Sequence, residues 1–146
     1  MIVTADAPTA DAPAASTTSA TPNTPFYKLG GYPAITAVVE RFYDLMEQDP
    51  AYAELRAMHA PDLSRMRKSL VGFLAGWSGG PRDWFEQNPG KCMMSAHKPF
   101  AITPRVAGQW AEAMKRAVAD AGIADAELAS AMGGVLSDMA LGMGRP

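Results

Sequence analysis

Apolar residues recur at steps of three and four along most of the chain after residue 25, and no long stretch alternates between apolar and polar residues. Such steps place side chains on one face of an α-helix, whereas strands alternate with a period of two. The fold class predicted is therefore all-α, with four principal helices. Their apolar faces comprise Ile35, Val38, Val39, Phe42, Leu45 and Met46; Leu63, Met66, Leu70, Phe73, Leu74 and Trp77; Val106, Trp110, Met114, Ala117 and Val118; and Leu128, Met132, Val135, Leu136, Met139 and Met143.

Capping and helix-breaking residues bound these helices. Residues with short polar side chains cap helix starts, proline is tolerated in a first turn, and glycine or proline ends a helix. Between 78 and 102 the chain is rich in Gly, Pro and Asn, which predicts a long loop with short helical turns, and such loops often carry function. The predicted boundary residues, in chain order, are Gly30-Gly31, Pro33, Asp49-Pro50, Asp62 or Ser64, the SGGP run at 78–81, Thr103-Pro104, Gly122 and Asp125.

The first 25 residues have a different composition from the rest. Ala, Thr and Pro make up 17 of them, so we expect residues 1–25 to form a disordered extension and residues 26–146 to form one folded domain. A secretory signal is not expected, since the extension lacks a basic start and an apolar run. A single cysteine cannot form an internal disulfide, which fits a cytoplasmic protein.

Charge and hydropathy exclude two classes of partner. Lys and Arg number 13 against 15 Asp and Glu, with no basic stripe, so no nucleic-acid partner is expected. No apolar stretch approaches the ~20 residues of a membrane span, so no membrane partner is expected either.

The stretch CMMSAHKPFAI, from Cys92 to Ile102, holds the only cysteine and one of two histidines. A structural zinc site needs four such ligands, and a Cys92–His97 nucleophile pair lacks a third residue to orient the imidazole. Helices rich in Met and aromatic residues, with a single imidazole, suit an iron porphyrin held by one axial ligand, with Phe100 and Ile102 packed on its ring. Taken alone, however, these residues favour a surface loop histidine over a haem ligand.

The order of the motifs resembles that of group II truncated haemoglobins. FYKLGG, ITAVVERFYDLM, LVGFLAGWSGGP, HKPFAI and RVAGQWAEAM follow one another with the family's spacing, over essentially all of residues 26–146. The resemblance implies a truncated globin domain, in which a two-over-two helical sandwich surrounds haem b. The helices near 35–48 and 62–77 would face those near 104–121 and 126–143.

The resemblance also implies roles for individual residues. His97 would be the proximal iron ligand. A phenol, an indole N–H and an imidazole near the opposite face could each donate a hydrogen bond to bound dioxygen, each worth roughly 0.5–1.5 kcal/mol. The residues implied at the distal site are Tyr43, His59 and Trp110, and those implied at the haem wall are Phe42, Met66 and Leu70, besides Phe100 and Ile102.

The function implied is reversible binding of O2, NO, CO or similar ligands at a five-coordinate haem iron, as in oxygen transport. Turnover of NO or peroxide, in the manner of an NO dioxygenase or peroxidase, would need electrons from a separate reductase. The family's arginines before the proximal histidine are replaced here by Met94, Ser95 and Ala96, which leaves Lys91, Lys98 and Arg67 as candidates to pair with the haem propionates. The alternative hypothesis is a cofactor-free helical interaction module whose Met-rich face includes Met132, Met139 and Met143.

Overall fold

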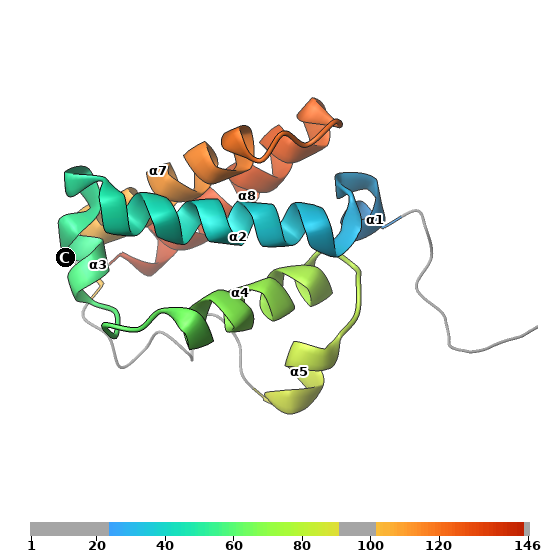
Figure 1. Ribbon diagram of the computed structural model, residues 1–146, viewed down its shortest axis with the longest axis horizontal. Helices are drawn as coiled ribbons and strands as arrows, with labels where there is room; N and C mark the ends of the chain where they lie inside the picture. The colour runs from blue at the N-terminus through green and yellow to red at the C-terminus, as the bar shows by residue number, and fades with distance from the viewer. Residues whose placement is uncertain (1–23, 91–101, 145–146) are drawn as a thin grey trace, which may run out of the picture.

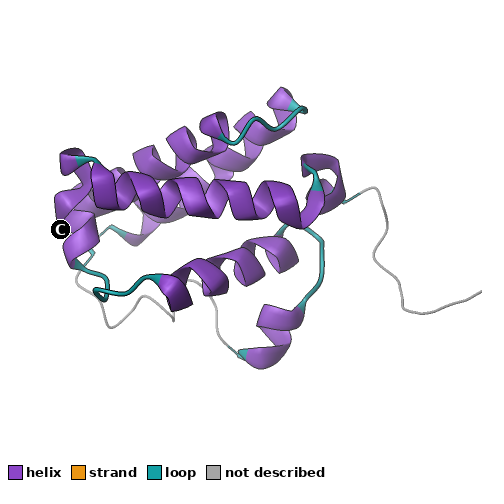
Figure 2. Cartoon of the chain, in the orientation of Figure 1, coloured by secondary structure: helices purple, strands orange, loops and turns teal. Residues whose placement is uncertain are grey.

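The computed structural model describes residues 24–90 and 102–144, and these contain helices and loops but no strand (Figures 1 and 2). The described part is therefore all-α, as predicted. Its elements are α1 (Pro25–Leu29), α2 (Gly31–Gln48), the 3-10 turn η1 (Pro50–Tyr52), α3 (Ala53–Ala57), α4 (Ser64–Trp77), α5 (Asp83–Gln87), α7 (Pro104–Asp120) and α8 (Ala126–Met143).

Helix α2 is the centre of the arrangement. It contacts α4 on one side and α7 on the other, and α7 packs along α8 (Figure 1). The six apolar residues predicted for its inner face are all buried, at no more than 4% exposure. This α2–α4 pair set against the α7–α8 pair is the two-over-two arrangement that the resemblance implied.

The helix boundaries follow the predicted capping residues. The Thr103 hydroxyl accepts from the Val106 backbone N–H at 3.2 Å, and the Asp125 carboxylate accepts from that of Leu128 at 3.0 Å. Each side chain satisfies a donor that has no intrahelical acceptor. At α4 the Asp62 carboxylate accepts from the backbone N–H of Ser64, at 2.9 Å, although Leu63 is the residue at the cap position.

The glycine pair after α4 allows α1 to pack closely against it. The Phe26 backbone N–H donates to the Ser78 carbonyl at 2.8 Å, and the Phe26 ring lies against Gly80. A Cβ at Gly80 would lie 2.5 Å from Cγ of Phe26, and Gly79 has φ of +98°, a conformation that only glycine adopts readily. The SGGP run is thus both a helix end and the seat of an aromatic ring from α1.

Two residues of the predicted apolar faces are exposed instead of buried. Val135 is 48% exposed, because the buried stripe of α8 runs through Met132, Leu136 and Met143 and leaves position 135 to one side. Met66 is 41% exposed, because none of the described helices covers that side of α4 completely.

The methionines of α8 do not form an exposed face. Met132 and Met143 are buried, at 5% and 8% exposure, and Met139 is half-buried against the core. This burial argues against the interaction module with a Met-rich binding face. Within 24–90 and 102–144, no helix has the length and hydropathy to cross a membrane.

Candidate functional site

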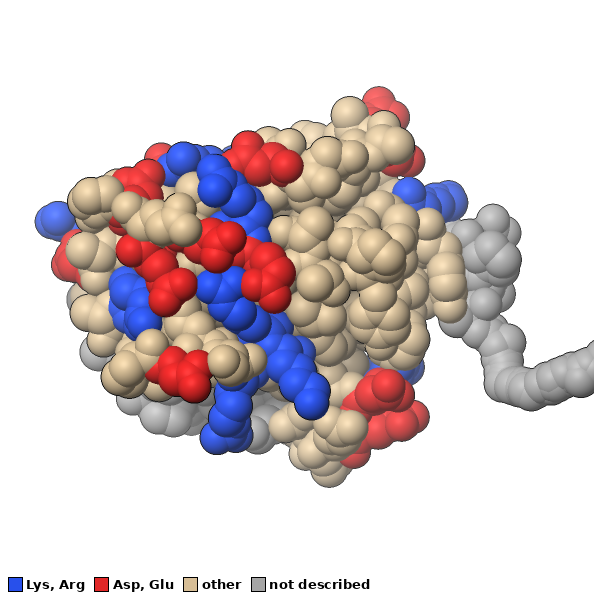
Figure 3. Space-filling view, in the orientation of Figure 1, with Lys and Arg blue, Asp and Glu red and all other residues tan. Residues whose placement is uncertain are grey.

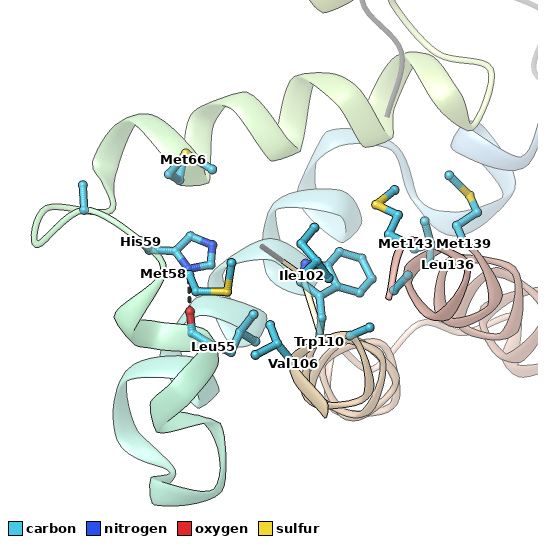
Figure 4. Close-up of a pocket in the computed structure, with 13 residues that line it drawn as sticks. Leu55, Met58, His59, Met66, Ile102, Val106, Trp110, Leu136, Met139 and Met143 are labelled. Carbon is cyan, nitrogen blue, oxygen red and sulfur yellow. Dashed lines mark hydrogen bonds between the residues drawn. The ribbon is translucent and has the colours of Figure 1, made fainter. Parts of the chain in front are cut away.

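A cavity of about 270 Å³ lies among α3, α4, α7 and α8 (Figure 4). Figure 4 shows Met66 of α4 on one side of it and residues of α7 and α8 on the other. Its described lining residues are Leu55, Met58, His59, Ala60, Met66, Ile102, Val106, Ala107, Trp110, Leu136, Met139, Ala140 and Met143.

The lining is almost wholly apolar. Four of its side chains are methionines, which are flexible and polarizable and pack well on aromatic surfaces. Within the described lining, only His59 and Trp110 carry a side-chain nitrogen. A cavity of this composition suits a large apolar ligand with few, specific polar contacts.

His59 follows α3 and lies at one end of the cavity (Figure 4). Its Nδ1 lies 2.8 Å from the Leu55 carbonyl oxygen, which can only accept. In the neutral ring we therefore place the proton on Nδ1 and the acceptor lone pair on Nε2. The Leu55 backbone N–H donates in turn to the Gln109 side chain at 3.1 Å, which ties this turn to α7.

Tyr43 is buried directly behind the cavity wall, at 3% exposure. Its ring packs edge-on against the His59 ring, with centroids 6.2 Å apart, and against Phe42 at 5.0 Å. Among the described residues its hydroxyl has no hydrogen-bond partner. Burial raises the pKa of Tyr43 to about 12, and the nearby Arg67 cation opposes that rise. The phenol is therefore a neutral donor at physiological pH.

Half-buried Trp110 carries the second donor. Helix α7 presents its indole to the cavity, and the indole packs against the Phe42 ring with centroids 5.1 Å apart. Its N–H has no hydrogen-bond acceptor in the described part of the chain. Buried donors are normally paired, so two unpaired donors in and behind one apolar cavity call for an explanation.

The predicted site residues fall into three groups. His59, Met66, Ile102 and Trp110 line the cavity, whereas Phe42, Tyr43 and Leu70 pack in the layer behind its wall. His97 and Phe100 lie outside the described residues. The roles assigned to all of these residues stay predictions.

Four of the nine other lining residues were predicted only as helix core. Val106, Leu136, Met139 and Met143 belong to the predicted apolar faces of α7 and α8, and periodicity alone does not distinguish a residue that faces a cavity from one that faces another helix. Leu55 and Met58 were missed altogether, because Leu55 lies in a helix with too few turns to show a period and Met58 is the cap that follows it. Ala60, Ala107 and Ala140 were missed as well.

Arg67 does not fit the role of a propionate partner. Its guanidinium is bound by three carboxylates of α2: Glu40, Asp44 at 3.2 Å and Glu47 at 3.1 Å. These contacts argue against that suggestion, because they direct the donors of Arg67 to α2. Lys91 and Lys98 lie outside the described residues.

Comparison with known proteins decides the family, since the model of bacterial-like globins matches residues 24–144. The chain belongs to the bacterial-like globins. It is 32% identical over 139 residues to a group 1 truncated hemoglobin from Chlamydomonas moewusii, a match that covers 90% of this chain and 77% of that relative.

Solved structures give the same result. This globin superimposes on a cold-adapted truncated hemoglobin from Pseudoalteromonas haloplanktis with a TM-score of 0.80 and 29% identity, over 85% of this chain and 99% of the other. For a group II 2-on-2 hemoglobin from Agrobacterium tumefaciens the values are 0.79 and 28%, over 84% and 94%. The chain is a truncated globin with the two-over-two arrangement, and membership of the family implies haem-based ligand binding.

Proposed function

We propose that this globin holds haem b in the cavity and reversibly binds O2, NO or CO on the side of Tyr43 and Trp110. The observation that carries the proposal is two hydrogen-bond donors without a partner among the described residues: the buried Tyr43 hydroxyl behind an otherwise apolar cavity, and the indole N–H of half-buried Trp110 in its wall. A buried donor without an acceptor costs about 1–3 kcal/mol. Such a cost is sustained most simply if a ligand supplies the acceptor.

The residues present fit a haem. Its flat faces need apolar, polarizable walls, and the four methionines, Ile102 and Trp110 provide them. The apolar lining would also exclude water, which strengthens any hydrogen bond made inside. When bound, haem supplies an iron able to hold a small diatomic ligand.

The chain's own residues would then set how tightly that ligand is held. The Tyr43 hydroxyl and the Trp110 indole N–H would each donate a hydrogen bond to its outer atom. His59 would not add a third through Nδ1, because that nitrogen is committed to the Leu55 carbonyl. Its place beside the Tyr43 ring instead suits it to orient the phenol.

His97 remains the proposed iron ligand. The support is the match to the family's motif, together with its position five residues before Ile102, whose side chain lines the cavity. No other histidine is open to this role, because His59 belongs to the Tyr43 side of the site.

Absorption spectroscopy tests the proposal. Protein supplemented with haem should show an intense porphyrin band that shifts when CO is added to the reduced form. His97→Gly should lose the five-coordinate ferrous spectrum, and added imidazole should restore it. A protein that shows no porphyrin band after haem is added would refute the proposal. Reductant and peroxide, added to the same sample, would reveal redox turnover.

A further inference from the structure

Arg67 of α4 lies between the surface of the molecule and the layer of side chains behind the cavity. Its guanidinium meets Glu40, Asp44 and Glu47 of α2, which lie on one face of that helix at steps of four and three. The exposed end of this cluster is part of the mixed patch of basic and acidic residues over α2 and α4 (Figure 3). The Arg67 side chain itself is only 20% exposed.

The same guanidinium covers the ring of Tyr43. Its central carbon lies 5.6 Å from the ring centroid, within the range of a cation–π contact. Tyr43 stands on α2 between the carboxylates that hold Arg67. The arginine is thus fixed by three anions in a position that places its charge on the phenol ring.

We propose that Arg67 is a positioning residue for Tyr43: it holds the ring in place and makes the hydroxyl a stronger hydrogen-bond donor to the bound ligand. This inference rests on the proposed function of the cavity. Arginine suits the task because its planar guanidinium engages several carboxylates and stacks on a ring at once, whereas a lysine ammonium is a flexible point charge.

The physical reason is electrostatic. A cation over the ring draws electron density from the phenol oxygen and makes its O–H more acidic, which strengthens donation. The charged and titratable groups around Tyr43 are Arg67 on α4, the three carboxylates of α2 that bind this arginine, and the His59 imidazole after α3. Of these charges, Arg67 is the one whose field acts to lower the pKa of Tyr43, against the larger effect of burial.

The chain contains a matched control. Arg116 of α7 donates to the Asp49 carboxylate at 2.8 Å and to the Tyr52 hydroxyl at 3.0 Å, and it lies 5.8 Å from the Tyr52 ring centroid. Like Arg67, it therefore pairs with a carboxylate of another segment and lies over a tyrosine ring; unlike Arg67, it also donates to that tyrosine's hydroxyl. Neither Arg116 nor Tyr52 lines the cavity.

The experiment compares Arg67→Met, Arg67→Lys and Arg116→Met in haem-loaded protein. Arg67→Met should speed O2 dissociation by about threefold to tenfold, the range that loss of a cation–π contact supports. It should also raise the C–O stretching frequency of the CO-bound form, because a weaker donor polarises CO less. Arg67→Lys should recover part of both effects. Arg116→Met should change neither, even if it lowers stability as much.

A double-mutant cycle with Tyr43→Phe decides whether the effect passes through the phenol. In the Tyr43→Phe background, Arg67→Met should leave O2 dissociation unchanged. An equal acceleration in both backgrounds would overturn the inference, as would no acceleration in the wild-type background or the same acceleration in Arg116→Met. Failure of the proposed function is distinct from all of these, since the wild-type protein would then bind neither haem nor CO.

Discussion

Replacing Tyr43 by Phe should make the ligand-free protein more stable and should make the bound ligand dissociate faster. The substitution keeps the ring, which is buried against Phe42 and His59, and removes only the hydroxyl. In the ligand-free protein that hydroxyl has no acceptor among the described residues, so its loss removes a desolvation cost. In the ligand-bound protein the same change removes a hydrogen bond.

The structure allows both magnitudes to be worked out. An unpaired buried donor costs about 1–3 kcal/mol, so ligand-free Tyr43→Phe should be more stable than wild type by about 1 kcal/mol. A hydrogen bond to an acceptor that carries charge is worth about 1.5–3 kcal/mol. At 1.36 kcal/mol for each factor of ten, its loss should accelerate O2 dissociation by about tenfold to a hundredfold, toward the lower end because Trp110 still donates.

Tyr52→Phe is the matched control for stability. The Tyr52 hydroxyl donates to Glu112 at 2.9 Å and accepts from Arg116 at 3.0 Å, so its removal breaks two hydrogen bonds in a buried residue. We expect Tyr52→Phe to be destabilised by about 1–3 kcal/mol, with unchanged O2 release.

The assays are denaturant unfolding of the haem-loaded, ligand-free ferrous protein and stopped-flow O2 release. If Tyr43→Phe is destabilised as much as Tyr52→Phe, the hydroxyl has an acceptor in the protein and the reasoning fails. If O2 release is unchanged, Tyr43 does not donate to the ligand.

Three further outcomes follow from the same structure. Gly80→Ala should destabilise the fold by about 1–3 kcal/mol, because the added Cβ collides with Phe26. Gly108→Ala should stabilise it by about 0.5–1 kcal/mol, because an added Cβ meets no atom there and Ala favours the helix α7; the midpoints of urea unfolding measure both. Between pH 10 and 12, the free energy of unfolding of wild type should fall by up to about 2.7 kcal/mol more than that of Tyr43→Phe. The reason is that the pKa of this phenol is near 10 in the unfolded chain and about 12 in the folded protein, and unfolding curves of both proteins at each pH check this. Thr103→Ala should cost about 1 kcal/mol by removing the cap of α7, seen as a lower melting temperature.

The helices could be predicted from sequence because their signals are local. Thr103 and Asp125 cap the helices they were predicted to cap, and the SGGP run ends α4 as expected. Burial was harder to predict, since the apolar residues of a helix recur with the same period whether or not another helix covers them. Met66 and Val135 were therefore placed on the apolar faces of their helices, although both are exposed.

The site depended on contacts between segments distant in sequence. The family resemblance pointed to Tyr43 and Trp110. It did not predict the contact between the Phe42 ring and the Trp110 indole, because that contact follows from the packing of α2 on α7. For Arg67, spacing within α4 gave no indication of its three partners, because they lie 20 to 27 residues earlier on another helix. An isolated charge in a sequence is read as solvated unless its neighbours in space are known.

Phe42 links the core to the site, and its truncation should disturb both. The ring is fully buried and lies between the two donors, 5.0 Å from Tyr43 and 5.1 Å from Trp110. Phe42→Leu shortens the side chain at that point and should lower stability by about 1–3 kcal/mol, because the surrounding helices collapse only in part onto the space left. It should also accelerate O2 release, since both donors lose the surface that orients them.

The control is Phe73→Leu, which truncates a ring of the same core that packs against Trp84 and Phe85 instead of the two donors. A comparable loss of stability is expected there, with O2 release unchanged. If Phe42→Leu and Phe73→Leu release O2 at the same rate, the donors are held by the backbone of their own helices, and the packing between α2 and α7 plays no part in ligand affinity.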